Sequence, residues 1–141
     1  CCGKGAWYSK IHSIYLYSGV PELMKLDPVL NEGVYVYTET TQPGKLTVDY
    51  IGLFKEKEAW TVILREENAI SAGLAYNFRA AWITLSAEIL LDQQGVTAAF
   101  SNVLNNCGIS CNVIAASRHD HIFVPYERAE EALAAIRKLE I

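Results

Sequence analysis

The stretch WITLSAEILLDQQGVTAAFSNVLNNCGISCNV, residues 82–113, decides the fold class of this 141-residue chain. Over residues 82–89, apolar side chains alternate with polar ones, which predicts a strand with one buried face. After a turn that ends at Gly95, apolar residues recur three and four positions apart. This spacing predicts an amphipathic helix, and Gly108 stands where a left-handed residue commonly ends one. Residues 109–116 then return to an extended, half-apolar pattern.

The rest of the second half predicts another strand and another helix. Ile122–Val124 is apolar throughout, and Pro125 opens a segment with apolar residues at helical spacing. The expected order is therefore β-α-β-β-α. A ferredoxin-like unit (βαββαβ) needs one more strand, so we expect the N-terminal half to supply it. The apolar face of the last helix consists of Ala129, Ala132, Leu133, Ile136 and Leu139.

The first half has a similar plan. Strands are predicted at 34–38 and 60–64, with an apolar segment at 46–54 between them and a short helix from Glu66 that Gly73 stops. Residues 62–69 and 122–129 share a strand-to-helix layout at a spacing of 60, which favours a duplicated module over a chance likeness. We therefore expect a leader over 1–20, a first module over 21–78 and a second over 79–141.

Composition limits the partners. The net charge of −4 is spread along the chain without a basic stripe, so nucleic acid is not expected as a partner. No apolar run reaches the 18 or so residues that span a bilayer, so we expect no membrane association and a cytoplasmic protein. The four cysteines do not form a disulfide framework, and Cys107 and Cys111 are expected to be small buried side chains.

His119-Asp120-His121 is the string most typical of an enzyme. Alternation along a strand puts both imidazoles on one face and the carboxylate on the other. Two ligands are too few for a metal site, and no third is identifiable by spacing, so we expect neither metal nor cofactor. A metal-dependent enzyme and a pH-sensitive hairpin remain alternatives. The chain has no phosphate loop and no nucleophile elbow, so no catalytic residue is assigned.

The turn before the predicted helix is the best candidate for binding. Backbone N–H groups at a helix start are free to bind a carboxylate, and the helix dipole favours a negative group there. Gly95 permits close approach of a ligand, and Thr97 adds a hydroxyl. The structural alternative is that Gly95 only makes the turn.

The motifs of the second half, taken in order, resemble the core of an ACT domain. The motifs are Gln-Gly-Val-Thr-Ala-Ala from residue 94, Gly-Ile-Ser-Cys-Asn-Val from residue 108 and His-Asp-His-Ile-Phe-Val-Pro from residue 119. Residues 22–141 as a whole are similar to small tandem proteins whose ACT domains are similar to the regulatory part of aspartate kinases. The resemblance implies two ferredoxin-like modules and an amino acid held at an interface between modules. The residues implied as ligand contacts are Gln94, Gly95, Val96, Thr97, Ile109, Ser110 and Asn112.

We therefore expect an α+β protein of two ACT-type modules, the second completed by a strand from the first half. The expected function is regulation through a bound small molecule, an amino acid, without catalysis. The expected partners are a second copy in a homodimer or a separate regulated enzyme. Asn112 is the sharpest candidate, because its amide can both donate and accept hydrogen bonds. The alternative is an assembly module with the same fold and no ligand.

Overall fold

The computed structural model describes residues 25–139 and shows an α+β protein, so the expected leader lies outside the described residues. One antiparallel sheet has the strand order β3-β4-β2-β5-β7-β6, and β1 pairs with β5 alongside it. The elements are β1 (Pro28–Leu30), β2 (Tyr35–Thr40), η1 (Pro43–Lys45), β3 (Gly52–Lys55), β4 (Trp60–Arg65), α2 (Glu66–Ser71), β5 (Arg79–Leu85), α3 (Val96–Asn106), β6 (Asn112–Ala115), β7 (Asp120–Pro125), η2 (Tyr126–Arg128) and α4 (Ala129–Arg137).

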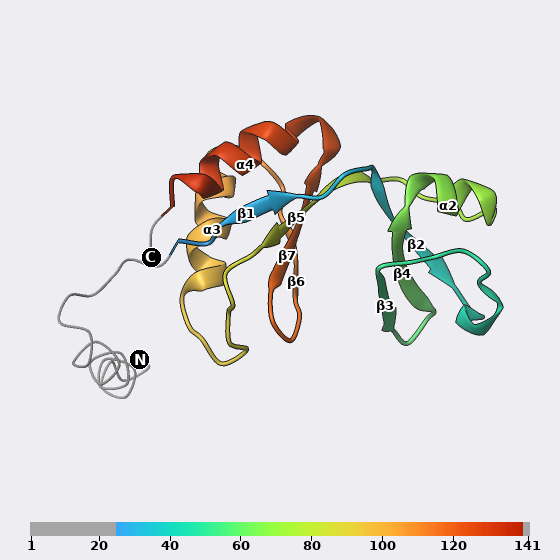
Figure 1. Cartoon of the computed structure of the whole chain (residues 1–141). Coiled ribbons are helices and arrows are strands. Elements are labelled where there is room, and N and C mark those ends of the chain that lie inside the picture. The colour runs from blue at the N-terminus through green and yellow to red at the C-terminus, as the bar shows by residue number, and fades with distance from the viewer. Residues whose placement is uncertain (1–24, 140–141) are drawn as a thin grey trace.

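The C-terminal module has four strands in the order β1-β5-β7-β6, with α3 and α4 packed on one face (Figure 1). Its own chain order is β5-α3-β6-β7-α4, as the sequence predicts. The missing strand is β1, which comes from the N-terminal half and pairs Pro28 with Leu85 and Leu30 with Ile83. The predicted ferredoxin-like fold, completed by a strand from the first half, is confirmed.

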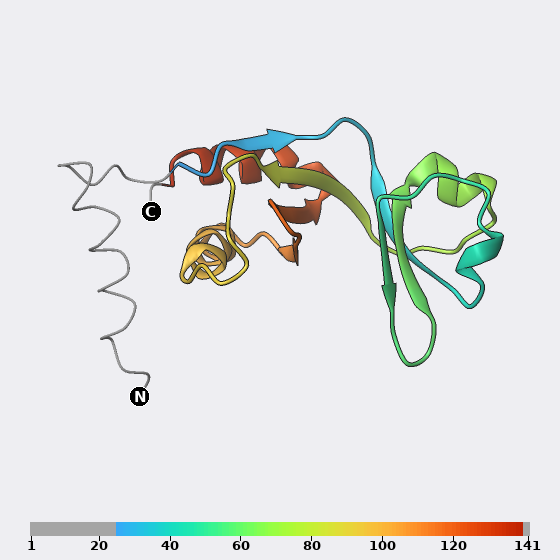
Figure 2. The same cartoon turned by 60° about the horizontal axis from the view of Figure 1, so that its bottom comes forward.

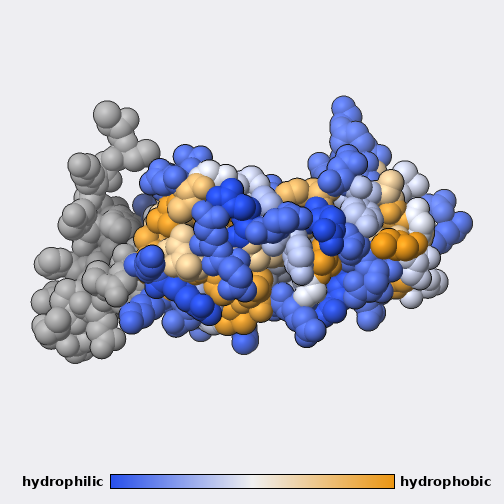
Figure 3. Space-filling model, turned by 90° about the horizontal axis from the view of Figure 1, so that it is seen from above, coloured by the Kyte–Doolittle hydropathy of each residue, from blue (hydrophilic) through white to orange (hydrophobic). Residues whose placement is uncertain are grey.

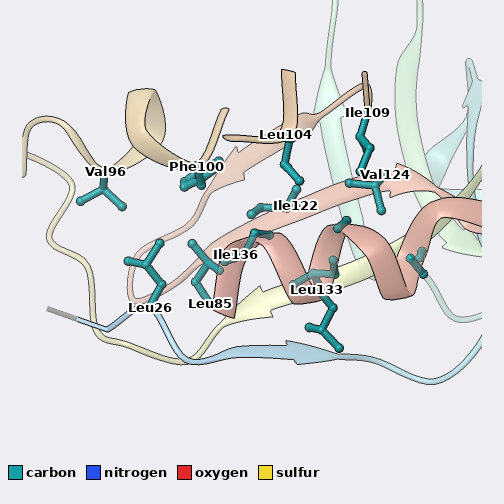
Figure 4. Packing of buried hydrophobic residues seen from close by; sticks show 14 of the residues in the cluster. Leu26, Leu85, Val96, Phe100, Leu104, Ile109, Ile122, Val124, Leu133 and Ile136 are labelled. Carbon is teal, nitrogen blue, oxygen red and sulfur yellow. The ribbon is translucent and has the colours of Figure 1, made fainter. Parts of the chain in front are cut away.

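The helix α3 forms because its apolar residues lie on one face and glycines stand at both ends. Gly95 and Gly108 adopt left-handed φ values of 88° and 70°, which a residue with a side chain rarely adopts. Between them, Phe100 and Leu104 are fully buried against the sheet and α4 (Figure 4). This module holds the largest core of the described residues, and its members include Leu26, Ile83, Leu85, Val96, Phe100, Leu104, Ile122, Val124, Leu133 and Ile136.

The N-terminal module contains β3, β4, β2 and the start of β5, covered on one face by α2. Between β2 and β3, where a ferredoxin-like unit has a helix, this module has only the single turn η1 and a loop. Pro43 and Gly44 oppose a longer helix there, because proline lacks an N–H and glycine is costly inside helices. The apolar segment predicted at 46–54 forms a strand only from Gly52 onward.

The strand β5 belongs to both modules. Its first residues, Arg79 and Ala80, pair with β2, and its last three pair with β1. The strand predicted at 82–89 therefore starts and ends earlier, at 79–85, while Ile89 is buried in the loop that follows. Long-range pairing sets these limits, which local alternation cannot show.

Each module has a helix face and an open face, and the two open faces meet at the junction of the modules. The strands of the N-terminal module cross the direction of β5 steeply (Figure 2). A separate apolar cluster fills the junction, and we call it the junction cluster. It consists of Tyr35, Ile63, Ala80 and Phe123, with Tyr37, Phe78 and Trp82 packed against it.

The expectation that both Cys107 and Cys111 are buried is wrong for Cys107, which is exposed. Cys107 caps the end of α3, beyond the buried Leu104, so its side chain faces solvent. Cys111 is half-buried beside α3, and burial raises the pKa of its thiol while a hydrogen bond from Ser101 opposes this.

Candidate functional site

The turn before α3 presents an open helix start, as the sequence predicts. No side chain caps the helix, and its first turn carries no acidic residue. Val96 is buried in the core, whereas Gln94, Gly95 and Thr97 are exposed. A Cβ added at Gly95 would meet nothing within 4 Å, so the space next to this turn is open. The first backbone N–H groups of a helix lack intrahelical partners and suit an anion.

The second group of expected contacts lies where the chain leaves α3 and enters β6. Ile109 is 3% exposed, and its N–H donates to Leu104 O at 2.9 Å, which closes the helix end. Ser110 and Asn112 are exposed. Asn112 is the first residue of β6 and stands opposite Phe123, so its side chain lies on the open face next to the junction cluster.

The two groups lie at opposite ends of α3, so one copy does not bring them together. The helix has 11 residues and is about 16 Å long at 1.5 Å per residue. The loop before α3 lies at the same end of the module as the turn between β6 and β7 (Figure 1). Gln94–Thr97 therefore lies near the end of β6, and Ser110 and Asn112 lie near its beginning.

The strands β6 and β3 lie at the two ends of the strand order, and β1, which begins with Pro28, is a further outer strand that pairs only with β5. The eleven residues from Cys107 to Ser117 include no charged side chain and no proline. By contrast, β3 ends at Lys55 and leads into the charged residues Glu56, Lys57 and Glu58. Natural edge strands are commonly protected against pairing by charges, prolines or bulges. Within the described residues, β6 is the edge without this protection.

Aromatic residues of the junction cluster are the feature that the sequence interpretation missed. Tyr37 meets Phe123 edge-on at 5.5 Å between ring centroids, and Tyr35 meets Trp82 edge-on at 5.2 Å. Tyr37 comes from the first module and Phe123, the cross-strand partner of Asn112, from the second. The alternating aromatic residues Tyr35 and Tyr37 on the predicted strand at 34–38 indicated an aromatic contact. The residues that they contact depend on how the two modules fold together.

Burial at the junction changes the ionisation of Tyr37. Desolvation, with a smaller effect of Cys111, raises the pKa of Tyr37 to about 12. The phenol therefore stays neutral at physiological pH and can serve as a hydrogen-bond donor or acceptor.

The string His119-Asp120-His121 lies at the start of β7. His121 lies on the open face, whereas Asp120 is 5% exposed and lies on the helix face, and burial raises the pKa of its carboxyl. His119 precedes the strand, and its Nδ1 lies 3.3 Å from Ala87 O. Among residues 25–139, no group of three or more His, Cys, Asp and Glu is arranged to hold a metal ion.

Seen from above, the molecule is mostly hydrophilic, with apolar side chains in separate groups (Figure 3). In the described part of the chain, no helix is long and apolar enough to cross a membrane.

Comparison with protein families gives two matches in tandem. One model described as an ACT domain matches residues 22–81, and a second model with the same description matches residues 77–138. The overlap of the two matches falls on the start of β5, the strand that both modules share. No curated protein matches the chain.

Solved structures match over most of the chain. A protein of unknown function from Vibrio cholerae, described as a possible transport protein, is 38% identical with a TM-score of 0.76, covering 92% of this chain and 96% of its own. The ligand-free regulatory subunit of aspartate kinase from Thermus thermophilus is 13% identical with a TM-score of 0.58, covering 83% and 98%. Aspartokinase III of E. coli, in complex with aspartate and ADP, is 13% identical with a TM-score of 0.59, covering 84% and 34%. At 13% identity the two kinase structures show the shared fold alone.

Proposed function

The chain belongs to the ACT-domain family, and on this premise we propose that it is a regulatory protein that binds an amino acid and catalyses no reaction itself. The observation that carries the proposal is the open start of α3. There, exposed Gln94, Gly95 and Thr97 surround backbone N–H groups that no side chain caps.

The chemistry of this turn fits the head group of an amino acid. The α-carboxylate accepts hydrogen bonds from backbone N–H groups at the positive end of the helix dipole. The hydroxyl of Thr97 and the amide of Gln94 can add further contacts. An α-ammonium group needs an acceptor, which the amide oxygen of Asn112 supplies.

A second copy of the chain can place its Asn112 next to the turn before α3. We propose that the unprotected β6 edges of two copies pair antiparallel about a two-fold axis, the usual symmetry of a homodimer. In such a pair, the beginning of each β6 lies next to the end of the other. Ser110 and Asn112 of one copy then lie next to Gln94–Thr97 of the other copy, and each dimer has two equivalent sites.

This arrangement gives the ligand a way to regulate. A ligand held by both copies stabilises the dimer, and the same free energy can shift the affinity for a separate enzyme chain. Coupling energies between sites are typically about 1–3 kcal/mol. The expected partners are therefore an amino acid, a second copy and a regulated enzyme.

A thermal unfolding screen of the full chain against each standard amino acid at millimolar concentration tests the ligand class. A ligand that prefers the folded state raises the unfolding midpoint, and calorimetry then gives its affinity. A rise with one amino acid supports the proposal and identifies the effector. No rise with any amino acid would contradict it and favour the assembly module without a ligand.

Asn112→Ala tests the site once the effector is known. Loss of a hydrogen bond to a charged group costs about 1.5–3 kcal/mol, so calorimetry should show at least about tenfold weaker binding. Asn102→Ala is the matched control, because Asn102 is exposed in the middle of α3 and should leave the affinity unchanged. Equal affinity of wild type and Asn112→Ala would exclude Asn112 from the site.

Ile114→Lys tests the dimer by placing a charge on the β6 edge. Analytical ultracentrifugation should show a dimer for the wild type and a weakened dimer for the variant. Phe54→Lys is the control on the other edge strand, β3, and should stay dimeric. A monomeric wild type, or weakening by Phe54→Lys alone, would overturn pairing through β6.

A further inference from the structure

A hydrogen-bond network on the open face connects His121 to the junction of the two modules. The indole N–H of Trp82 donates to His121 Nδ1 at 3.0 Å, and Thr84 Oγ1 lies 3.1 Å from the same nitrogen. Asn31 Nδ2 donates to Thr84 Oγ1 at 2.9 Å and lies 3.2 Å from Trp82 O. The network therefore joins β5, β7 and the segment that leads from β1 into the N-terminal module.

The chemistry of Trp82 fixes the protonation state of His121 in this arrangement. An indole nitrogen can only donate, so Nδ1 of His121 must carry a lone pair. The imidazole is then neutral, with its proton on Nε2. Thr84 Oγ1 already accepts from Asn31, and its own O–H is free to donate to Nδ1 as well.

Protonation at Nδ1 reverses these roles. The new N–H can donate to Thr84 Oγ1, but it opposes the N–H of Trp82 and leaves the indole without an acceptor. Neutral His121 thus accepts a hydrogen bond from Trp82, whereas protonated His121 can bind only Thr84. Histidine is the side chain whose ordinary pKa allows such a change near neutral pH.

Trp82 transmits the change because it also packs in the junction cluster. Its ring meets Tyr35 of the N-terminal module at 5.2 Å and stacks with Phe123 at 6.3 Å between centroids. Both chain connections between the modules lie close by, since Asn31 N donates to Trp82 O at 2.9 Å and Ala80 pairs with Tyr35. A loosened Trp82 therefore weakens contacts on which the mutual position of the modules depends.

Few charges act on His121 from its surroundings. The ionisable neighbours are His119 and Asp120 from the same hairpin. The residues that face His121 from the neighbouring strands are uncharged, namely Trp82 and Thr84 on β5, Ile114 on β6, and Val29 and Asn31 from β1 and the segment after it. Protonation of His121 is thus the main change of charge on this part of the open face.

We propose that His121, Trp82, Thr84 and Asn31 form a proton-sensitive contact, in which protonation of His121 releases the Trp82 indole and loosens the junction between the two modules. This inference does not depend on the proposed ligand.

The direction of the pKa shift fixes the pH window. Burial, assisted by His119 and opposed by Asp120, lowers the pKa of His121 below its usual value. The unfolded chain therefore takes up this proton first, at about pH 6.5. The stabilising contribution of neutral His121 is complete above that pH and is lost as the pH falls toward the lower folded-state pKa.

Solution NMR of the full chain between pH 8 and pH 5 tests the proposal without any ligand. The ring nitrogens of His121 report its protonation, and the indole N–H resonance of Trp82 reports the hydrogen bond. We expect both to change with the same midpoint. We also expect the protection factors of the Tyr35 and Ala80 amides against hydrogen exchange to fall about tenfold over the same range.

The control is His121→Asn, whose side-chain oxygen can accept near the position of Nδ1 but does not titrate. Its Trp82 resonance should stay constant over this pH range. In His119→Asn the Trp82 resonance should still follow His121, with a midpoint at slightly higher pH because His119 no longer lowers the pKa of His121. A Trp82 resonance that does not follow His121 would overturn the proposal, as would a His121 that stays neutral until the protein unfolds. These outcomes are decided on wild type even if a variant does not fold.

Discussion

The two modules share a plan and differ in one element. The strands β4 and β7 lie 60 residues apart at Trp60–Arg65 and Asp120–Pro125, and each leads into a helix. Between the first two strands, the C-terminal module has the 11-residue helix α3, and the N-terminal module has only the turn η1. The strands that the two modules have in common thus preserve the fold. Only the C-terminal module has the helix α3, whose first backbone N–H groups suit an anion.

The two modules also differ in their hydrophobic cores, because only the C-terminal module has α3. The helix α3 contributes Val96, Phe100 and Leu104 to the core of the C-terminal module. In the N-terminal module, Leu46 and Val48 from the loop cover the same position and are only partly buried. We therefore expect the C-terminal module to dominate stability.

Phe100→Ala should have the largest effect. Phe100 is fully buried, and removal of a buried phenylalanine typically costs about 3–5 kcal/mol. Because β5 belongs to both modules, denaturant unfolding followed by circular dichroism should show one transition at lower denaturant. The control Phe54→Ala, at a residue 71% exposed in the N-terminal module, should change the free energy of unfolding by less than about 0.5 kcal/mol. Similar losses for both variants would contradict a dominant C-terminal core.

Gly95→Ala should have an intermediate effect on stability and a specific effect on binding. The left-handed φ of 88° makes a side chain unfavourable by about 1 kcal/mol, although the space around it is open. Calorimetry should also show weaker binding of the amino acid, because the turn must relax away from the ligand. Gly44→Ala in the loop of the N-terminal module is the control, since its φ is ordinary and nothing lies within 4 Å. If both variants bound equally well, the turn before α3 would not be the ligand site.

Thr38→Val should have the smallest effect and the opposite sign. Thr38 is 5% exposed in the N-terminal module, and its Oγ1 has no hydrogen-bond partner among the described residues. Replacing an unpaired buried hydroxyl with a methyl group should stabilise the protein by up to about 1 kcal/mol in thermal unfolding. Thr61→Val in the same module should not, because the hydroxyl of Thr61 donates to Glu56 at 2.5 Å. A clear loss of stability in Thr38→Val would reveal a partner for this hydroxyl.

The sequence predicted those parts of the fold that local patterns determine. The spacing of apolar residues and Gly108 located α3. The second module lacks one strand in its own sequence, and this correctly indicated that the first half supplies it. The true start of β5 at Arg79 was missed, because it depends on pairing with Val36, far along the chain. No helix was predicted between the first two strands of the N-terminal module, and the structure has only the turn η1 and a loop there.

The sequence indicated single candidate residues for the site but not their arrangement in space. Gly95 and Asn112 have the exposure expected of ligand contacts, yet they lie at opposite ends of α3. Periodicity gives the face on which a residue lies and not the distance between two ends of a helix. The junction cluster was missed for the same reason, since Tyr37 and Phe123 meet only when the two modules fold against each other.

If two copies of the C-terminal module complete each amino-acid site, a mixture of two defective variants should regain binding. Gly95→Ala and Asn112→Ala chains are unfolded together, refolded and titrated by calorimetry at a ligand concentration that occupies neither variant alone. In a mixed dimer, both defects fall in one site and the other site is intact. Binding should recover at about one site per four chains, since about half of the dimers are mixed. No recovery, with dimers present, would contradict it and place both residues outside a shared site.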